Sequence, residues 1–107
     1  MNTRRIQQIE KRITRIKQEL QKLGPMRPGS LTRQYRDPKK NVGAFWQISY
    51  TRQMKSRSEY IRKEWVSQIR QQIATHKKFR SLIDEWVDLG IEHSKLTMQT
   101  AKRKATE

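Results

Sequence analysis

A seven-residue hydrophobic repeat near the N-terminus is the feature that most limits what this chain can fold into. Its apolar residues are separated alternately by three and four positions, and they are Ile6, Ile9, Ile13, Ile16, Leu20 and Leu23. This spacing places one apolar stripe along a helix. The stripe is shielded from water only when the helix packs on another helix. Asn2 or Thr3 can cap its start, and Gly24-Pro25 can end it. The repeat therefore predicts a helix over residues 1–23 with a helical partner.

A second helical pattern covers residues 63–100. Its apolar residues recur at helical spacing without an intervening proline, and they are Trp65, Val66, Ile69, Ile73, Phe79, Leu82, Ile83, Trp86, Val87 and Leu89. Gly90 is the weakest position for a helix. A break near residues 75–78 is the alternative to one continuous helix, and the tail over 101–107 is expected to fray.

The segment between the helices, residues 24–62, has a different pattern. Pro25, Pro28 and Gly29 make an irregular beginning. Three short stretches of strand type follow over residues 31–36, 44–52 and 57–62, with turn residues at 37–43 and 53–56. This order predicts a three-stranded antiparallel meander.

Together these elements predict a single α+β domain over residues 1–107. Because the chain leaves the first helix and enters the second at the sheet, we expect an antiparallel helical hairpin with the sheet at its tip. The first helix then covers only its own length of the second, which leaves apolar side chains from Trp86 to Met98 without a partner. A second subunit is the simplest cover, so we predict a homodimer; a helix that folds back on itself is the alternative.

The net charge of +15 requires a reason, because self-repulsion of this size opposes a compact fold. Ten basic residues and two acids, Asp37 and Glu59, lie in residues 24–63, so much of the excess surrounds the predicted sheet. Such charge is typical of proteins that bind polyanions. The apolar runs are too short for a membrane span or a signal peptide, and there are no cysteines. These features predict a cytoplasmic protein that binds nucleic acid and not a membrane or a small-molecule substrate.

Strand alternation sorts the side chains of the predicted sheet into two faces. The face expected to pack on the helices carries Leu31, Trp46, Ile48, Tyr50 and Ile61. The opposite face carries mostly short polar and basic side chains: Thr32, Gln34, Arg36, Gln47, Ser49, Thr51, Tyr60 and Arg62. Arginine can bond bidentately to guanine, glutamine to adenine, and serine or threonine to either. We therefore predict that this second face reads base edges in the major groove of duplex DNA.

Other basic residues are expected around this face, in loops and at strand ends, where they would contact phosphates. They are Arg33, Lys39, Lys40, Arg52, Lys55, Arg57 and Lys63. A polar face is also what any one-sided antiparallel sheet presents, so the same side chains can be plain solvated surface. The concentration of positive charge in this segment favours binding.

Several stretches resemble a family of small uncharacterised prokaryotic proteins that are often associated with mobile elements. They are Met26–Leu31, Tyr35-Arg36, Phe45–Tyr50 and Tyr60-Ile61, followed by a basic helix. That family commonly has a cysteine-rich knuckle where this chain has residues 37–41, so the resemblance implies no metal here. Three antiparallel strands followed by a helix are also similar to the arm-site-binding domains of tyrosine recombinases and to the ethylene-response class of plant regulators. These likenesses imply a regulator of transcription or a mobile-element accessory factor, which could associate with the nucleoid.

No nucleophile motif, phosphate loop or cofactor fingerprint is present, so we expect neither an enzyme nor a cofactor. His76 and His93 have no partner at metal-ligand spacing, which favours surface or helix-interface roles. Asp84, Asp88 and Glu92 recur every four residues. A cation or nuclease site is one interpretation of them, and ion pairing with the first helix or a partner subunit is the stronger one.

Two other functions remain open. The first is RNA binding, for which the basic segment and its tyrosines, Tyr35, Tyr50 and Tyr60, are also suitable. The second is a coiled-coil adaptor whose positive charge meets an acidic protein.

Overall fold

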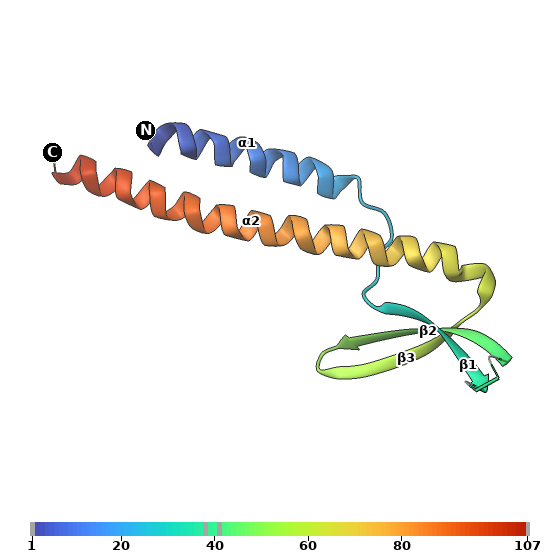
Figure 1. Cartoon of the computed structure of the whole chain (residues 1–107). Helices are drawn as coiled ribbons and strands as arrows, with labels where there is room; N and C mark the ends of the chain where they lie inside the picture. The colour runs from blue at the N-terminus through green and yellow to red at the C-terminus, as the bar shows by residue number, and fades with distance from the viewer. Residues whose placement is uncertain (1, 38, 41, 107) are drawn as a thin grey trace. The chain divides into compact units, whose positions relative to one another are not determined.

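The computed structural model describes residues 2–37, 39–40 and 42–106. For residues 42 and 103–106 it describes the backbone alone. The elements are α1 (Asn2–Gln21), β1 (Ser30–Asp37), β2 (Val42–Arg52), β3 (Lys55–Ile61), the short 3-10 helix η1 (Lys63–Trp65) and α2 (Val66–Thr106) (Figure 1). This is the predicted α+β fold. The chain forms two compact units: Gly24–Lys77, here called the sheet unit, and Met1–Leu23 with Lys78–Glu107, here called the helical unit.

The apolar repeat of α1 is buried as predicted. Ile9 and Ile16 are fully buried, and the remaining members of the repeat are half-buried. The helix begins at Asn2, so both predicted cap residues, Asn2 and Thr3, lie inside it. The helix ends at Gln21, earlier than predicted, and the amide of Leu23 then donates a tighter turn bond of 3.2 Å to the carbonyl of Leu20.

α2 is one continuous helix of 41 residues. The alternative break near residues 75–78 does not occur, and the helix begins three residues later than predicted because η1 precedes it. α2 continues to Thr106, six residues beyond the predicted bound at residue 100, and the fraying of the tail stays a prediction. Neither glycine nor proline follows Gly90, so nothing in the sequence ends the helix earlier. No helix in the described part of the chain is long and apolar enough to cross a membrane.

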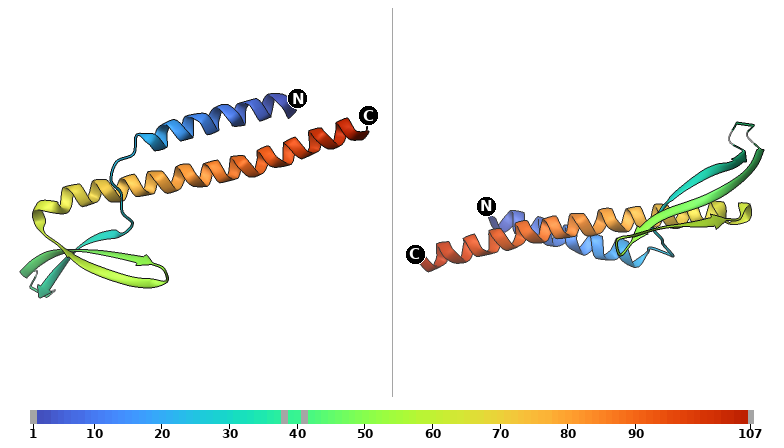
Figure 2. Two further views of the ribbon diagram at one scale, coloured as in Figure 1. Left: turned by 180° about the vertical axis from the view of Figure 1, so that it is seen from behind. Right: turned by 90° about the horizontal axis from the view of Figure 1, so that it is seen from below.

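Within the helical unit, α1 lies antiparallel beside the C-terminal half of α2 (Figures 1 and 2). Arg5 pairs with Glu92 at 2.6 Å and Arg12 with Glu85 at 2.5 Å. Leu82 is buried on the same side of α2. The expectation that α2 lacks an intrachain partner from residue 86 onward is therefore wrong for the side that faces α1.

The cause of this difference lies in the connection between α1 and β1. In the sheet unit, residues 24–29 run beside the first turns of α2, where the amide of Arg27 donates to the carbonyl of Gln72 at 3.2 Å. Gly24 and Pro25 line a surface hollow with Gln68 and Gln72. The extended connection thus occupies the part of α2 that α1 was expected to cover.

The three strands form an antiparallel sheet in the order β1-β2-β3, as predicted. β2 is the central strand: Trp46, for example, lies between Arg33 of β1 and Ile61 of β3. The turn between β2 and β3 has two residues, Gln53 and Met54, rather than the four predicted. β3 consequently starts at Lys55 and ends at Ile61, so it is shifted toward the turn.

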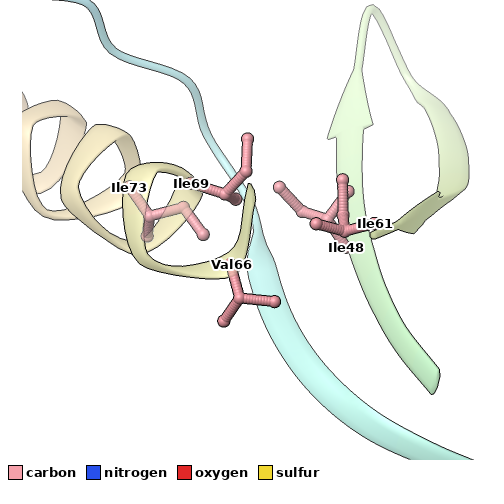
Figure 3. Close-up of a cluster of buried hydrophobic side chains, with 5 residues drawn as sticks. All are labelled: Ile48, Ile61, Val66, Ile69 and Ile73. Atoms are coloured by element: carbon pink, nitrogen blue, oxygen red, sulfur yellow. The ribbon is translucent and has the colours of Figure 1, made fainter. Parts of the chain in front are cut away.

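A small apolar core joins one face of the sheet to the start of α2 (Figure 3). Ile48 is fully buried, and its buried neighbours are Ile61, Val66, Ile69 and Ile73. Leu31 and Trp46 pack against this cluster as predicted. Gly29, at a φ of 140°, allows the connection to pass closely, because a Cβ there would lie 2.8 Å from Cγ1 of Ile48. The core fixes which face of the sheet remains open to solvent.

Candidate nucleic-acid interface

The sheet face that points away from the core, here called the outer face, is built by all three strands. Ile48 and Ile61 point into the core, so their neighbours along each strand point outward. Register and alternation assign to it Ser30, Thr32, Gln34, Arg36, Phe45, Gln47, Ser49, Thr51, Ser56, Ser58 and Tyr60. The predicted packed face is confirmed for Leu31, Trp46, Ile48 and Ile61, whereas Tyr50 lies outside this core, and the outer face contains no acid.

Hydroxyl groups lie opposite one another across the outer face of β2 and β3. The Oγ atoms of Ser49 and Ser58 are 3.4 Å apart, and Thr51 Oγ1 is 3.4 Å from Ser56 Oγ. These contacts are long for hydroxyl pairs and are exposed to solvent. These hydroxyl groups can therefore give up their mutual contacts and bond to a ligand at little cost in free energy.

Gln47 lies at the centre of the outer face. It is flanked in register by Thr32 on β1 and Tyr60 on β3. Thr32 accepts a 3.1 Å hydrogen bond from the amide of Gln34 and donates a 3.4 Å bond to the backbone carbonyl of Gln47. The middle of the face is thus a surface of neutral donors and acceptors.

Sequence reasoning leaves Ser30, Phe45 and Ser56 out of the outer face, whereas it places Ser58 opposite Ile61 without giving it a binding role. The sequence predicts a turn at Ser56, because the two-residue turn at Gln53 and Met54 has no glycine or asparagine to mark it. Both residues have positive φ, 52° and 65°, the conformation of a tight hairpin turn. Period-two alternation from Trp46 and Ile48 would have placed Phe45 correctly.

Four of the predicted phosphate-binding residues lie at the two hairpin turns. Lys39 and Lys40 form the described part of the β1–β2 turn, where the Lys40 amide lies 3.3 Å from the carbonyl of Asp37. Arg52 and Lys55 face each other in register across the β2–β3 turn. All four side chains are exposed, so positive charge borders the outer face at both turns.

Arg36 and Arg62 are the two arginines predicted to lie on the outer face itself. Arg36 is on the outer face, and its stem passes over Gly43, where an added Cβ would approach to 3.0 Å. Gly43 also has a φ of 73°, so glycine serves both the turn and the arginine. Arg62 follows β3 in extended backbone and is exposed. It lies beyond the paired part of β3, so its place on the outer face stays a prediction.

Arg33 and Arg57 lie in mid-strand rather than in loops or at strand ends, so that expectation is wrong. Their pairing with Trp46 and Tyr50 places both on the face that also carries the core. They stay exposed because the core covers only the area around Ile48 and Ile61. Of the remaining predicted cations, Lys63 is the first residue of η1 and is exposed.

The acid of β3, Glu59, is engaged on this same inner side. Tyr50 donates a 2.6 Å hydrogen bond to it, and Arg27 approaches to 3.5 Å. The bond from Tyr50 and the charge of Arg27 lower the pKa of Glu59, and the same bond raises the pKa of Tyr50. Arg27 also lies 5.2 Å from the Tyr50 ring centre. Glu59 therefore does not place negative charge on the outer face.

The carboxylates of α2 serve the helical unit. Hydrogen bonds from Arg12 and Arg5 lower the pKa of Glu85 and Glu92. His93 lies 3.0 Å from Glu10, which places it at the helix interface. Within the described ranges, no three acidic or histidine side chains gather closely enough to hold a metal ion. Glu92 thus has the ion-pairing role favoured for the acidic stripe.

Comparison with known proteins relates the chain to one family. No match is found among curated proteins or among solved structures. A family model, described as a domain of unknown function, matches residues 6–71, which include most of α1, the whole sheet and the start of α2. This is more than half of the chain, and it contains every residue of the outer face. The chain therefore belongs to the family DUF6788, a domain of unknown function.

Proposed function

We propose that the protein binds duplex DNA through the outer face of its sheet. The observation that carries this proposal is an exposed, acid-free surface of neutral hydrogen-bonding groups with cations at both adjoining turns. A sheet of this kind fits the major groove, whose base edges offer a distinct donor and acceptor pattern for each base pair. Regulation of transcription, or assistance to a mobile element, is the context we propose.

The side chains divide into two roles under this proposal. Gln47 and Arg36 are the best suited to bidentate base contacts, with Ser49 and Thr51 as shorter donors and acceptors. The exposed lysines and arginines at the turns contact phosphates and set the register of the protein on the duplex. Arg33 and Arg57 lie on the other face, so they add to the electrostatic attraction without reading bases.

The proposal includes a homodimer formed through the helical unit. α2 keeps an apolar stripe that α1 does not cover: Val87 is 54% exposed, Ile91 52% and Met98 62%. Beside it, Ile83, Trp86, Val87 and Gly90 line a shallow groove. A Cβ at Gly90 would meet no atom within 4 Å, so nothing inside the unit explains a mid-helix glycine that costs about 0.5–1 kcal/mol.

Local charge supports a second copy of this chain as the occupant of that groove. Residues 78–100 contain three basic residues and four acids, a net charge of −1, in a chain of +15. Exposed Asp84 and Asp88 border the apolar stripe on one side, and exposed Lys95 follows one helical turn beyond Ile91. The α2 side of the groove therefore adds little repulsion between two copies, while Lys17 of α1 lies 5.4 Å from the ring centre of Trp86. Replacing Val87 and Ile91 by aspartate should give a helical monomer by sedimentation; an unchanged dimer would contradict this interface.

The test of DNA binding is a salt titration with a random-sequence duplex, followed by fluorescence anisotropy. Binding should weaken steeply with salt, since each phosphate contact contributes close to one unit of slope in a log–log plot. The double change Arg36→Ala and Arg62→Ala should weaken binding by at least about tenfold, because two charge-assisted contacts are lost. Circular dichroism should show that its fold is preserved.

The matched control removes the same charge from the helical unit, with Lys11→Ala and Arg80→Ala, which are exposed in the structure. This control should bind DNA within about twofold of the unchanged protein. Equal affinity in the Arg36 and Arg62 variant would contradict the role of the outer face. Negligible binding to duplex DNA at low salt would remove DNA as the partner and favour RNA or an acidic protein.

A further inference from the structure

The sheet has a stepped end beside η1. β3 ends at Ile61, which pairs with Trp46, whereas β2 begins at Val42. The residues of β2 before Trp46 are therefore paired with β1 alone. A hollow of about 450 Å³ occupies this step. We call it the aromatic hollow, and its lining includes Arg33, Phe45, Trp46, Tyr60, Ile61 and Lys63.

Aromatic rings dominate the lining. Phe45 and Tyr60 lie diagonally across β2 and β3, with ring centres 6.3 Å apart and planes tilted by 40°. Tyr60 is 65% exposed, so most of its surface is open to a ligand. Both rings belong to the outer face, and the hollow is therefore continuous with the proposed DNA-binding surface.

Positive charge accompanies these rings. Arg33 and Lys63 line the hollow and are exposed, and its lining includes no acid. Arg70 lies 4.9 Å from the ring centre of Trp46, which adds a third cation nearby. A planar ligand that carries negative charge is the chemistry that fits both features.

We infer that the aromatic hollow binds one unpaired nucleobase together with its phosphate, at the border of the duplex site. The inference rests on the proposed DNA-binding function and names a further part of the DNA that the protein recognises. Bases stack on aromatic rings whatever their identity, and the adjoining cations can hold the phosphate. A paired base would first have to leave the helical stack, which costs energy, whereas an unpaired base enters more easily. The protein should therefore prefer duplexes that contain an unpaired nucleotide.

The experiment compares two duplexes of the same sequence, one fully paired and one with a single bulged 2-aminopurine, at the same salt concentration. The full-length protein should bind the bulged duplex at least about fivefold more tightly, the low end of what one stacked base contributes. Stacking should also quench the fluorescence of the bulged base. In a Phe45→Ser and Tyr60→Ser double variant, the affinities for the two duplexes should differ by less than about twofold.

Three variants separate this site from the rest of the interface. Lys63→Ala should weaken the bulged complex more than the paired one and does not touch the rings. The control pair Arg52→Ala and Lys55→Ala, at the β2–β3 turn, should weaken both complexes by the same factor and keep the ratio. Equal affinities of the unchanged protein for the two duplexes would overturn the inference and leave duplex binding intact. A preference that survives in the double serine variant would also overturn it, while failure to bind either duplex would overturn the proposed function itself.

Discussion

The sheet unit and the helical unit use their charged side chains in different ways. Residues 24–63 contain ten basic residues and two acids, and the one ion pair found there among described residues joins Arg27 to Glu59. In the helical unit, Arg5 and Arg12 each hold a glutamate of α2 in a bidentate contact. Arg5 and Arg12 are thus paired across the helices, whereas Arg27 alone among the basic residues of 24–63 has an ion pair within the described part of the chain.

This difference separates structural charge from charge that is available to a partner. Bidentate arginine–carboxylate pairs are directional, so those of the helical unit favour one alignment of α1 on α2. Unpaired cations around a small sheet repel one another and lower its stability. That repulsion has no structural benefit in the sheet unit, whose core is small. A polyanion would relieve it, which is why the comparison supports nucleic-acid binding by the sheet.

The largest effect on stability should come from truncating one fully buried side chain in the core of each unit. Ile48→Ala in the sheet unit and Ile16→Ala in the helical unit both remove a fully buried side chain, and each should cost about 2–5 kcal/mol of unfolding free energy. Amide hydrogen exchange reports stability region by region. Each variant should speed exchange most in its own unit. Equal acceleration along the whole chain would show that the two units unfold as one and would break the comparison.

Most of the fold follows from two periodicities in the sequence. The three-four repeat from Ile6 to Leu23 located α1, and alternation in residues 44–52 located β2 and its two faces. Alternation succeeds because the side-chain period of a strand is two, so the buried position of Ile48 fixes the outward direction of Gln47 and Ser49. The outer face was therefore largely predictable.

What could not be predicted depends on contacts between elements. The apolar pattern of α2 does not reveal that residues 24–29 run beside its first turns, so it predicts the wrong position of α1 along α2. Arg33 and Arg57 are exposed only because the core is narrow, which strand propensity cannot show. The aromatic hollow exists because β3 ends at Ile61, and strand ends are set by pairing rather than by local sequence.

An intermediate effect is expected at the β2–β3 turn. Gln53 and Met54 both have positive φ, which side chains other than glycine and asparagine adopt at a cost, and Met54 is 99% exposed. Replacing them by asparagine and glycine should relieve this and stabilise the sheet unit by about 1 kcal/mol. Thermal unfolding should show a higher midpoint, and exchange in the helical unit should not change. A lower midpoint would mean that the Met54 side chain contributes contacts that its exposure does not reveal.

The smallest effect, and the one that tests the comparison most directly, is on acid stability. Hydrogen bonds from Arg12 and Arg5 lower the pKa of Glu85 and Glu92 in the folded chain. A carboxyl with a lowered pKa stabilises the fold above its unfolded value, about 4.3, and loses that contribution as the pH falls through the folded pKa. The helical unit should therefore lose stability as the pH falls below about 4.3. The Glu85→Gln and Glu92→Gln double variant should lose less stability over the same pH range than the unchanged protein.

The matched comparison uses Asp84→Asn and Asp88→Asn, which remove the same charge from exposed positions of the same helix. Exchange in the helical unit, measured from pH 6 to pH 3, should change its pH dependence in the glutamate variant and not in the aspartate variant. If both variants flatten the acid response equally, the effect belongs to the net charge of α2 rather than to the two arginine pairs. The helical unit would then resemble the sheet unit, with charge that no specific partner holds, and the distinction between structural and available charge would fail.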